Sequence, residues 1–241
     1  MIQLIKGDCL EQMKLIPNAS VDAIITDPPY GTTACKWDSV IDFKLMWEQL
    51  NRIIKPNGAI VLFGSQPFTS ALIMSNPKSF KYEWIWEKTM ATGGLMAKYR
   101  PMKAHENVLV FNTNKKSVYN EQRLDGKAYE RKEGTKKNSI IGDKKGGYVT
   151  KSKGGRCARS VFKVPNPNAK SLHPTQKPIL LMEYLIKTYT NENETVLDFT
   201  MGSGSTGVAA KNLNRNFIGI EQDQKYFNIA KNRINELRPN R

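Results

Sequence analysis

The sequence predicts an α/β fold in which a mostly parallel sheet carries helices on both faces and one basic, loop-rich insert. Three observations predict it. Short apolar runs alternate with amphipathic segments of helix length. A glycine-rich turn lies between an expected strand and an expected helix near the C-terminus. Between residues 115 and 163 the alternation stops, and this segment contains 15 Lys or Arg but only 5 Asp or Glu.

The N-terminal elements are bounded by aspartate, proline and glycine. The run before Asp27 is apolar and predicts a buried strand, and the helix that begins at Asp42 is stopped by Pro56 and Gly58. Trp84 and Trp86 share one face of a further strand. Strands are expected at residues 21–26, 59–63, 82–86 and 107–111, and helices at 42–54 and 68–74.

The C-terminal elements follow the insert. Pro178 opens a helix to about Tyr189, because proline favours the first helical position. Asp223 is expected to cap the last helix, which runs through Leu237. Between them we expect a strand at 195–198, a glycine loop at 202–207, a helix at 206–213 and a strand at 217–220. Too little chain follows residue 195 for a complete sheet, so the N-terminal strands must complete it.

Composition restricts the class of protein. The 241 residues are 39% hydrophobic and suffice for one elaborated domain or two small ones. No apolar run approaches the length of a membrane span, and no secretory signal is visible, so a cytoplasmic location is expected. Cys9, Cys35 and Cys157 are scattered, and His105 and His173 are isolated, so we expect neither a disulfide nor a metal site.

Charge points to a polyanionic partner. The formal net charge is +15 and the sequence pI is about 9.7, and most of the excess lies in the insert. Glycines such as Gly126 and Gly134, with few large apolar residues, predict a loop-rich excursion there. A solvated, partly disordered basic insert without a partner is the alternative interpretation.

The glycine turn predicts a nucleotide site. Gly202, Gly204 and Gly207 fit the pattern GxGxxG, and glycine lets a backbone turn tightly and pass close to a ligand. Glu221, at the end of the next strand, suits ribose hydroxyls. The pattern alone fits any adenosine-bearing cofactor, and a tight turn without a ligand is the alternative.

The second motif is Asp27-Pro28-Pro29-Tyr30, whose chance occurrence in such a chain is on the order of one in a thousand. Two prolines hold the backbone extended and remove two amide donors. The Asp27 carboxylate and the Pro28 carbonyl can accept both hydrogens of an exocyclic amine, while Tyr30 stacks on the ring. The motif therefore predicts a site for an aminopurine or aminopyrimidine. A strand-ending turn with a packed tyrosine is the alternative.

Together, these motifs resemble the amino-methylating DNA methyltransferases. Their order, with the insert between them, is similar to that of the permuted group called beta, and the resemblance covers nearly the whole chain. It implies a Rossmann-like, circularly permuted fold and S-adenosylmethionine as the cofactor. It also implies methyl transfer to adenine N6 in double-stranded DNA after base flipping. Residues 1–112 and 166–241 would form the catalytic and cofactor-binding domain, and 113–165 the target-recognition insert. A homodimer and a cognate restriction endonuclease are left open.

The resemblance also assigns roles to residues. Asp8 would accept from the cofactor adenine, Thr175 and Lys177 would hold the methionine carboxylate, and Glu221 would bind the ribose. The family commonly has phenylalanine where this chain has Thr200, so either Phe199 or Thr200 would cover the methionine. The catalytic set is Asp27, Pro28, Pro29 and Tyr30. The cofactor-binding set is Asp8, Cys9, Asp27, His173, Thr175, Lys177, Asp198, Phe199, Gly202, Ser203, Gly204, Ser205, Thr206 and Glu221.

Three rival functions remain at this stage. Cytosine N4 or an RNA amino group would use Asp27 in the same way, although aspartate before Pro28 resembles the adenine enzymes more than serine would. A nicotinamide oxidoreductase would need a full doubly wound half after residue 195. A non-enzymatic nucleic-acid binder would keep the insert without needing the two motifs. A cytosine C5 enzyme is disfavoured, because the family with that chemistry uses a Pro-Cys nucleophile and no Pro-Cys pair occurs here.

Overall fold

A computed structural model describes residues 1–32, 38–113, 116–132, 134, 146–167, 172–173 and 175–236. The chain forms two compact units, one made of Met1–Asn120 with Ser160–Arg241 and one made of Glu121–Arg159. Cys35 and the predicted helix end at Leu237 lie outside the described residues.

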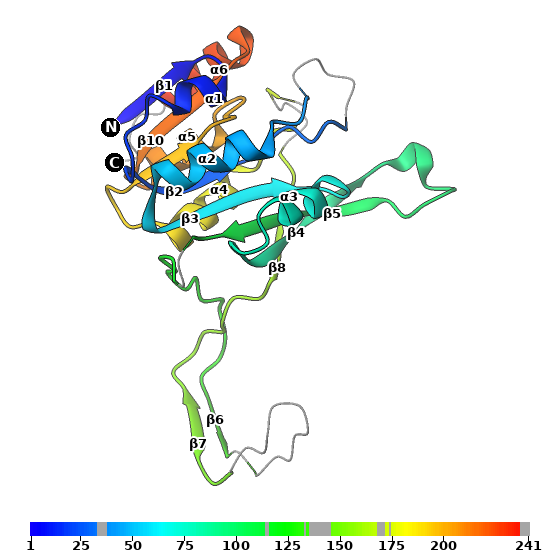
Figure 1. Cartoon of the computed structure of the whole chain (residues 1–241). Coiled ribbons are helices and arrows are strands. Elements are labelled where there is room, and N and C mark those ends of the chain that lie inside the picture. Colours follow the sequence, from blue (N-terminus) through cyan, green and yellow to red (C-terminus); the bar gives the residue numbers. More distant parts are fainter. Residues whose placement is uncertain are drawn as a thin grey trace. The chain divides into compact units, whose positions relative to one another are not determined.

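The larger unit is built on an 8-stranded sheet (Figure 1). The spatial order is β1 (Ile2–Lys6), β10 (Asn216–Glu221), β9 (Thr195–Asp198), β2 (Val21–Thr26), β3 (Ile54–Gly64), β5 (Lys103–Phe111), β4 (Phe80–Thr92) and β8 (Val161–Val164). The strands β1, β10, β9, β2 and β3 are adjacent in that order and mutually parallel, and β4 is parallel to β8. β5 lies between β3 and β4 and is antiparallel to both. The predicted mostly parallel α/β sheet is thus confirmed.

Helices cover both faces of this sheet, as predicted. On one face lie α1 (Cys9–Met13), α2 (Phe43–Ile53) and α3 (Phe68–Ser75), and on the other α4 (Ile179–Tyr189), α5 (Ser205–Asn212) and α6 (Gln224–Glu236) (Figure 1). Alternate strand residues such as Ile24, Leu197 and Ile218 pack into the core layer beneath α1 to α3. Within the described ranges, no helix is long and apolar enough to cross a bilayer.

The observed elements of the larger unit differ from the expected ones at several points. β1 and α1 were not predicted. β3 begins directly after α2, because Val21 pairs with Ile54 before the register shifts to Ala23 and Ala59. Pro178 precedes α4 as its N-cap instead of occupying the first helical position. The remaining predicted strands and helices fall on observed elements, although β4 extends to Thr92 and β5 begins at Lys103, so both strands are longer than expected.

The smaller unit, Glu121–Arg159, contains an antiparallel pair of strands. β6 (Tyr129–Lys132) pairs with β7 (Val149–Ser152), and the Arg156 guanidinium lies 5.0 Å from the centroid of the Tyr129 ring. The expected loop-rich insert thus holds a hairpin. Its range also differs from 113–165, because β8 pairs with β4 and belongs to the larger unit. The target-recognition role of 113–165 stays a prediction.

Candidate active site

A cavity of about 400 Å³ opens at the carboxyl ends of four parallel strands. It is lined by residues that directly follow β1, β2, β9 and β10, including Gly7, Asp27, Phe199 and Gln222. Ligands of open α/β sheets bind at this edge, because loops from neighbouring strands converge there. Segments far apart in the sequence therefore form one site.

The cavity gathers nearly all of the predicted site residues. Of the predicted set, Gly204 alone does not line it; its φ is +81°, and a Cβ there would lie 3.0 Å from the Ala230 Cβ, so this glycine permits close packing of α5 against α6. The predicted residues that line the cavity are Asp8, Cys9, Asp27, Pro28, Pro29, Tyr30, His173, Thr175, Lys177, Asp198, Phe199, Gly202, Ser203, Ser205, Thr206 and Glu221.

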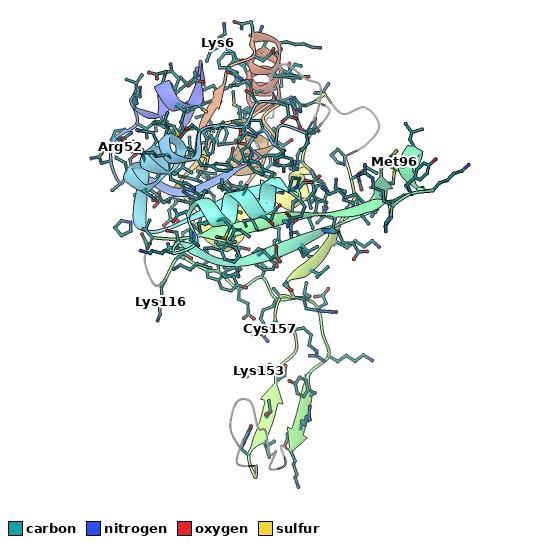
Figure 2. The ribbon with its side chains drawn as sticks, turned by 45° about the vertical axis from the view of Figure 1, so that its right-hand side comes forward. Lys6, Arg52, Met96, Lys116, Lys153 and Cys157 are labelled. Atoms are coloured by element: carbon teal, nitrogen blue, oxygen red, sulfur yellow. The ribbon has the colours of Figure 1, made fainter. Side chains whose placement is uncertain are left out.

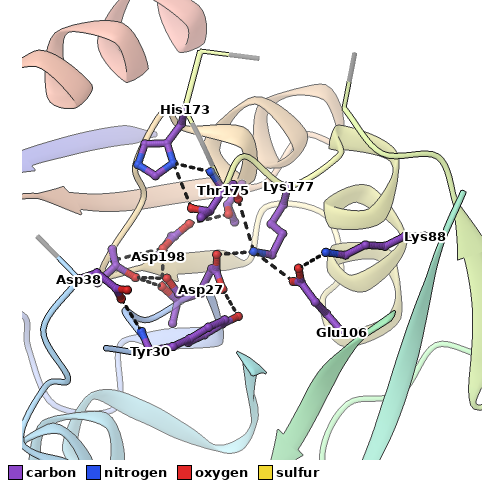
Figure 3. Close-up of polar contacts among 12 residues, drawn as sticks. Asp27, Tyr30, Asp38, Lys88, Glu106, His173, Thr175, Lys177 and Asp198 are labelled. Atoms are coloured by element: carbon purple, nitrogen blue, oxygen red, sulfur yellow. Dashed lines mark hydrogen bonds and ion pairs between the residues drawn. The ribbon is translucent and has the colours of Figure 1, made fainter. Parts of the chain in front are cut away.

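The Asp27 carboxylate is engaged through both of its oxygens (Figure 3). The Tyr30 hydroxyl donates to Oδ1, and the Lys177 ammonium donates to Oδ2. Burial raises the pKa of Asp27, and Lys177 opposes this effect. The Tyr30 ring also packs against Phe68, with 5.0 Å between ring centroids. Asp27 is thereby held in one orientation at the cavity wall.

A chain of alternating charges continues from Asp27 (Figure 3). Lys177 Nζ lies 3.3 Å from Glu106 Oε2, and Glu106 Oε1 lies 2.5 Å from Lys88 Nζ. Burial alone would lower the pKa of Lys177, but the carboxylates of Asp27 and Glu106 outweigh it and raise that pKa. Burial would raise the pKa of Glu106, but Lys177 and Lys88 lower it. Lys177 and Glu106 are therefore kept in their charged forms by their neighbours.

Thr200 joins the glycine loop to the Asp27 motif. Its hydroxyl donates to the backbone carbonyl of Asp27 over 3.0 Å and lies 2.8 Å from the Thr26 hydroxyl. Phe199, the other candidate for covering the methionine, is buried in the core layer while it also lines the cavity. The Thr200 hydroxyl, at the position where the resembled family commonly has phenylalanine, thus links the glycine loop to the loop that begins at Asp27.

Asp198 lies beneath this link and is almost fully buried. Its carboxylate accepts hydrogen bonds from the hydroxyls of Thr26 and Thr206 and from the Thr200 amide. Burial raises the pKa of Asp198 to about 6, and the hydrogen bonds from Thr206 and Thr26 oppose this shift. Asp198 therefore joins β2, the glycine loop and α5 from below the cavity.

Asp38 organises the loop after Tyr30. One carboxylate oxygen accepts from the amides of Tyr30 and Gly31, at 2.8 and 2.9 Å, and the other accepts from the Thr32 amide at 2.9 Å. Three backbone donors on one carboxylate fix this turn beside the Asp27 motif.

Glu221, Gly202 and Ser205 form the part of the wall that suits a nucleoside. Glu221 accepts from the amides of Gly202 and Asp223, and burial raises its pKa. Ser205 Oγ lines the cavity, is buried, and has no hydrogen-bond partner within the described residues. A buried hydroxyl without a partner is costly unless a ligand supplies one. The site therefore fits a polar, hydroxyl-bearing cofactor.

His173 lies next to Gly202, where a Cβ added to the glycine would be 3.6 Å from the imidazole ring. Its ring packs 4.1 Å from that of Tyr226, measured between centroids, and Nδ1 accepts from the Thr175 amide over 3.2 Å. Burial, together with the Lys177 charge, lowers the pKa of His173 to about 4. Lys177, expected to hold a methionine carboxylate, has Asp27 and Glu106 as its partners in the structure. Its role toward a methionine carboxylate stays a prediction.

Asp8 and Cys9 follow β1. Asp8 is the N-cap of α1 and accepts from the Glu11 amide through Oδ1, which leaves Oδ2 for a ligand. Burial, with a contribution from Asp8, raises the pKa of Cys9 to about 12, so the thiol is inert at neutral pH. Among the described residues, no group of three His, Cys, Asp or Glu side chains could hold a metal ion.

Sequence reasoning missed Asp38, Glu106, Lys88 and Tyr226. Glu106 and Lys88 lie on antiparallel strands whose pairing brings them together, with Glu106 opposite Trp86 in the register. Nothing in the local sequence distinguishes them from surface charges. Asp38 comes 8 positions after Tyr30 in the sequence. Its contact with the backbone of the Asp27 motif appears only in the folded loop, so no local pattern predicts it.

Comparison with known proteins gives one consistent result. The family described as DNA methylase, N6_N4_Mtase, matches residues 21–232. The chain is 30% identical to the type II methyltransferase M.HinfI of Haemophilus influenzae, over 98% of this chain and 69% of that protein. It is 30% identical to the type II methyltransferase M1.MboII of Moraxella bovis, over 97% of this chain and 96% of that one.

Solved structures agree. The crystal structure of an M1.HpyAVI–SAM complex matches with a TM-score of 0.64 at 32% identity and covers 98% of this chain and 100% of that one. The cytosine-N4-specific PvuII DNA methyltransferase matches with a TM-score of 0.69 at 15% identity, over 96% of this chain and 86% of that one. The second likeness concerns the fold alone.

Proposed function

The chain belongs to the N6/N4 DNA methylase family and is an S-adenosylmethionine-dependent DNA amino-methyltransferase, and on this premise we propose that it methylates adenine N6 in double-stranded DNA. The observation that supports an amino group as the methyl acceptor is the Asp27 carboxylate, which is held in one orientation on the cavity wall and is followed by two prolines. Aspartate at this position, where serine would resemble the cytosine-N4 enzymes, favours adenine.

The residues of the cavity fit the cofactor. Glu221 would bind the ribose hydroxyls, Asp8 Oδ2 the adenine amino group, and Ser205 Oγ a polar group that reaches it. When bound, S-adenosylmethionine supplies an electrophilic methyl group on a sulfonium centre. The closeness of these residues to Asp27 supports placing cofactor and target base in one cavity.

Asp27 and Pro28 would orient the target nitrogen. A carboxylate has about four lone-pair directions, so Asp27 can keep Tyr30 and Lys177 as donors and still accept an N–H from the base. The Pro28 carbonyl would accept the second hydrogen. Positioning of this kind lowers the barrier by fixing the approach of the nucleophile.

Residues 113–165 would recognise the target sequence. The smaller unit carries 12 Lys or Arg against 5 Asp or Glu, a charge that suits contacts with DNA phosphates. Exposed Tyr129 and Tyr148 beside these cations offer surfaces for bases. The homodimer and the cognate restriction endonuclease, left open by the resemblance, stay predictions.

The test is transfer of labelled methyl from S-adenosylmethionine to duplex DNA of mixed sequence, followed by digestion to nucleosides. We expect the label in N6-methyladenine. We also expect Asp27→Asn to lower the rate by about a hundredfold or more while cofactor affinity, measured by calorimetry, stays within about threefold. Label in N4-methylcytosine would overturn the choice of base, and full activity of Asp27→Asn would overturn the role of the carboxylate.

A further inference from the structure

β4 and β5 continue beyond the body of the sheet as a projecting arm, residues 89–102, which carries Met96 near its end (Figures 1 and 2). The two strands pair as far as Glu87 and His105 and once more at Thr92 and Lys103. A short 3-10 helix, η1 (Gly94–Met96), forms the tip.

The arm exposes large apolar side chains. Leu95 is 99% exposed, Tyr99 82% and Met90 70%, and Met96 and Met102 are also exposed. The same segment contains Lys98 and Arg100 and no acidic residue. Clustered apolar side chains at a surface indicate an interaction site, and the positive charge indicates a polyanionic partner.

The arm is ordered by its own hydrogen bonds. The amides of Tyr99 and Arg100 both donate to the Met96 carbonyl, at 2.9 and 3.0 Å. At the base of the arm, Asn166 accepts from the Met90 amide at 3.0 Å and donates to the Met90 carbonyl at 3.3 Å. The backbone is thus held in place while its apolar side chains are left exposed.

The arm starts next to the catalytic network. Lys88, the last residue before it, pairs with Glu106, which lies 3.3 Å from Lys177, the partner of Asp27. The base of the arm therefore lies beside the side chains that hold Asp27 at the cavity.

We propose that the arm is a wedge that enters the DNA base stack and fills the space left by the flipped target base, with Leu95 and Tyr99 as the inserted side chains. This inference rests on the proposed function. Flipping a base costs unstacking energy, and apolar side chains inserted between bases recover part of it. Lys98 and Arg100 then contact the flanking phosphates.

The test compares single-turnover methylation of two duplexes, one with the target adenine paired and one with it opposite an abasic site. The variant is Leu95→Ala with Tyr99→Ala, and both side chains are exposed, so the fold is unaffected. The matched control is Leu180→Ala, because Leu180 is 66% exposed on α4. We expect the double variant to lose about tenfold or more on the paired target and less than about twofold on the unpaired one, since only the former must be opened.

Other outcomes overturn the wedge. Equal losses on both duplexes would show that the arm merely binds DNA, and no loss would show that it is not used. A change of oligomeric state in sedimentation, with equal rates per assembled enzyme, would show that the arm contacts a second copy of the chain. Inactivity of the unaltered chain on both duplexes would instead contradict the proposed function, and the wedge would be rejected with it.

Discussion

The ammonium of Lys177 donates a hydrogen bond to the carboxylate of Asp27, 150 positions earlier in the chain. Asp27 follows β2, and Lys177 lies just before α4, so this pair joins the two halves of the site across the insert. Because Glu106 lies on the other side of Lys177, one buried cation separates two carboxylates. Lys177 thus orients Asp27 and opposes the rise in its pKa that burial causes.

Lys177→Met is expected to raise the pKa of Asp27, because the nearest cation is lost while the carboxylates of Asp27 and Glu106 remain together. If the carboxylate is the active form, the acidic limb of the activity profile moves to higher pH, and kcat near neutral pH falls by about tenfold or more. Methyl-transfer rates measured from about pH 5 to pH 9 would show the shift.

Lys55→Met is the control for this prediction, because Lys55 pairs with Asp22 over 2.7 Å and neither residue lines the cavity. It should leave the pH profile unchanged. Lys177→Arg keeps the charge and should restore part of the rate. An acidic limb that stays in place in Lys177→Met would contradict the positioning role.

Thr200→Val removes the hydroxyl that donates to the Asp27 carbonyl and keeps the shape of the side chain. One lost hydrogen bond of about 1 kcal/mol lowers kcat by roughly five- to tenfold if it holds the motif in place. Thr188→Val is matched to it, because the buried Thr188 hydroxyl donates to the Tyr184 carbonyl over 2.8 Å within α4. Rate losses of the same size in both variants would show that only stability is affected.

The fold was predictable where the pattern of apolar residues is strong. The strand before Asp27 and the strand ending at Asp198 were found to the residue, since both are buried runs that stop at an acidic side chain. β1 was missed because it is an edge strand whose residues are half exposed, so no buried run marks it. The sequence prediction included the residues of β8 in the insert, because only the pairing of β8 with β4 shows that it belongs to the sheet.

The site was predictable where residues cluster in the sequence. The Asp27 motif and the glycine loop are local patterns, and the structure brings both to one cavity. The partners of Lys177 were not predictable, because Glu106 reaches it only through strand pairing. The position of Gly204 away from the cavity follows from packing against Ala230, which no local pattern encodes.

Asp198 predicts a pH-dependent stability. Its pKa is about 6 in the folded protein against an ordinary 3.8, so the folded state binds the proton more tightly than the unfolded chain. Its contribution is therefore fully present below about pH 4 and lost as the pH rises through 6. Urea titrations of the native protein and of Asp198→Asn give the difference between their free energies of unfolding. This difference, native minus variant, should fall by about 1 kcal/mol between about pH 5 and pH 7. A difference that rises with pH would contradict the assignment.

His173 is expected to remain neutral throughout the working range of the protein. Burial and the charge of Lys177 lower its pKa to about 4, so protonation favours the unfolded chain, and stability is lost as the pH falls from about 6.5 towards 4. Because Nδ1 accepts from the Thr175 amide, the proton resides on Nε2. The chain has two histidines, so His105→Gln leaves one imidazole for nitrogen NMR. Its signals should show the Nε2–H tautomer and stay constant between about pH 5.5 and pH 8, whereas the same chain in urea should titrate near pH 6.5. A midpoint near 6.5 in the folded protein would show that the ring is not held against Tyr226 as the structure has it.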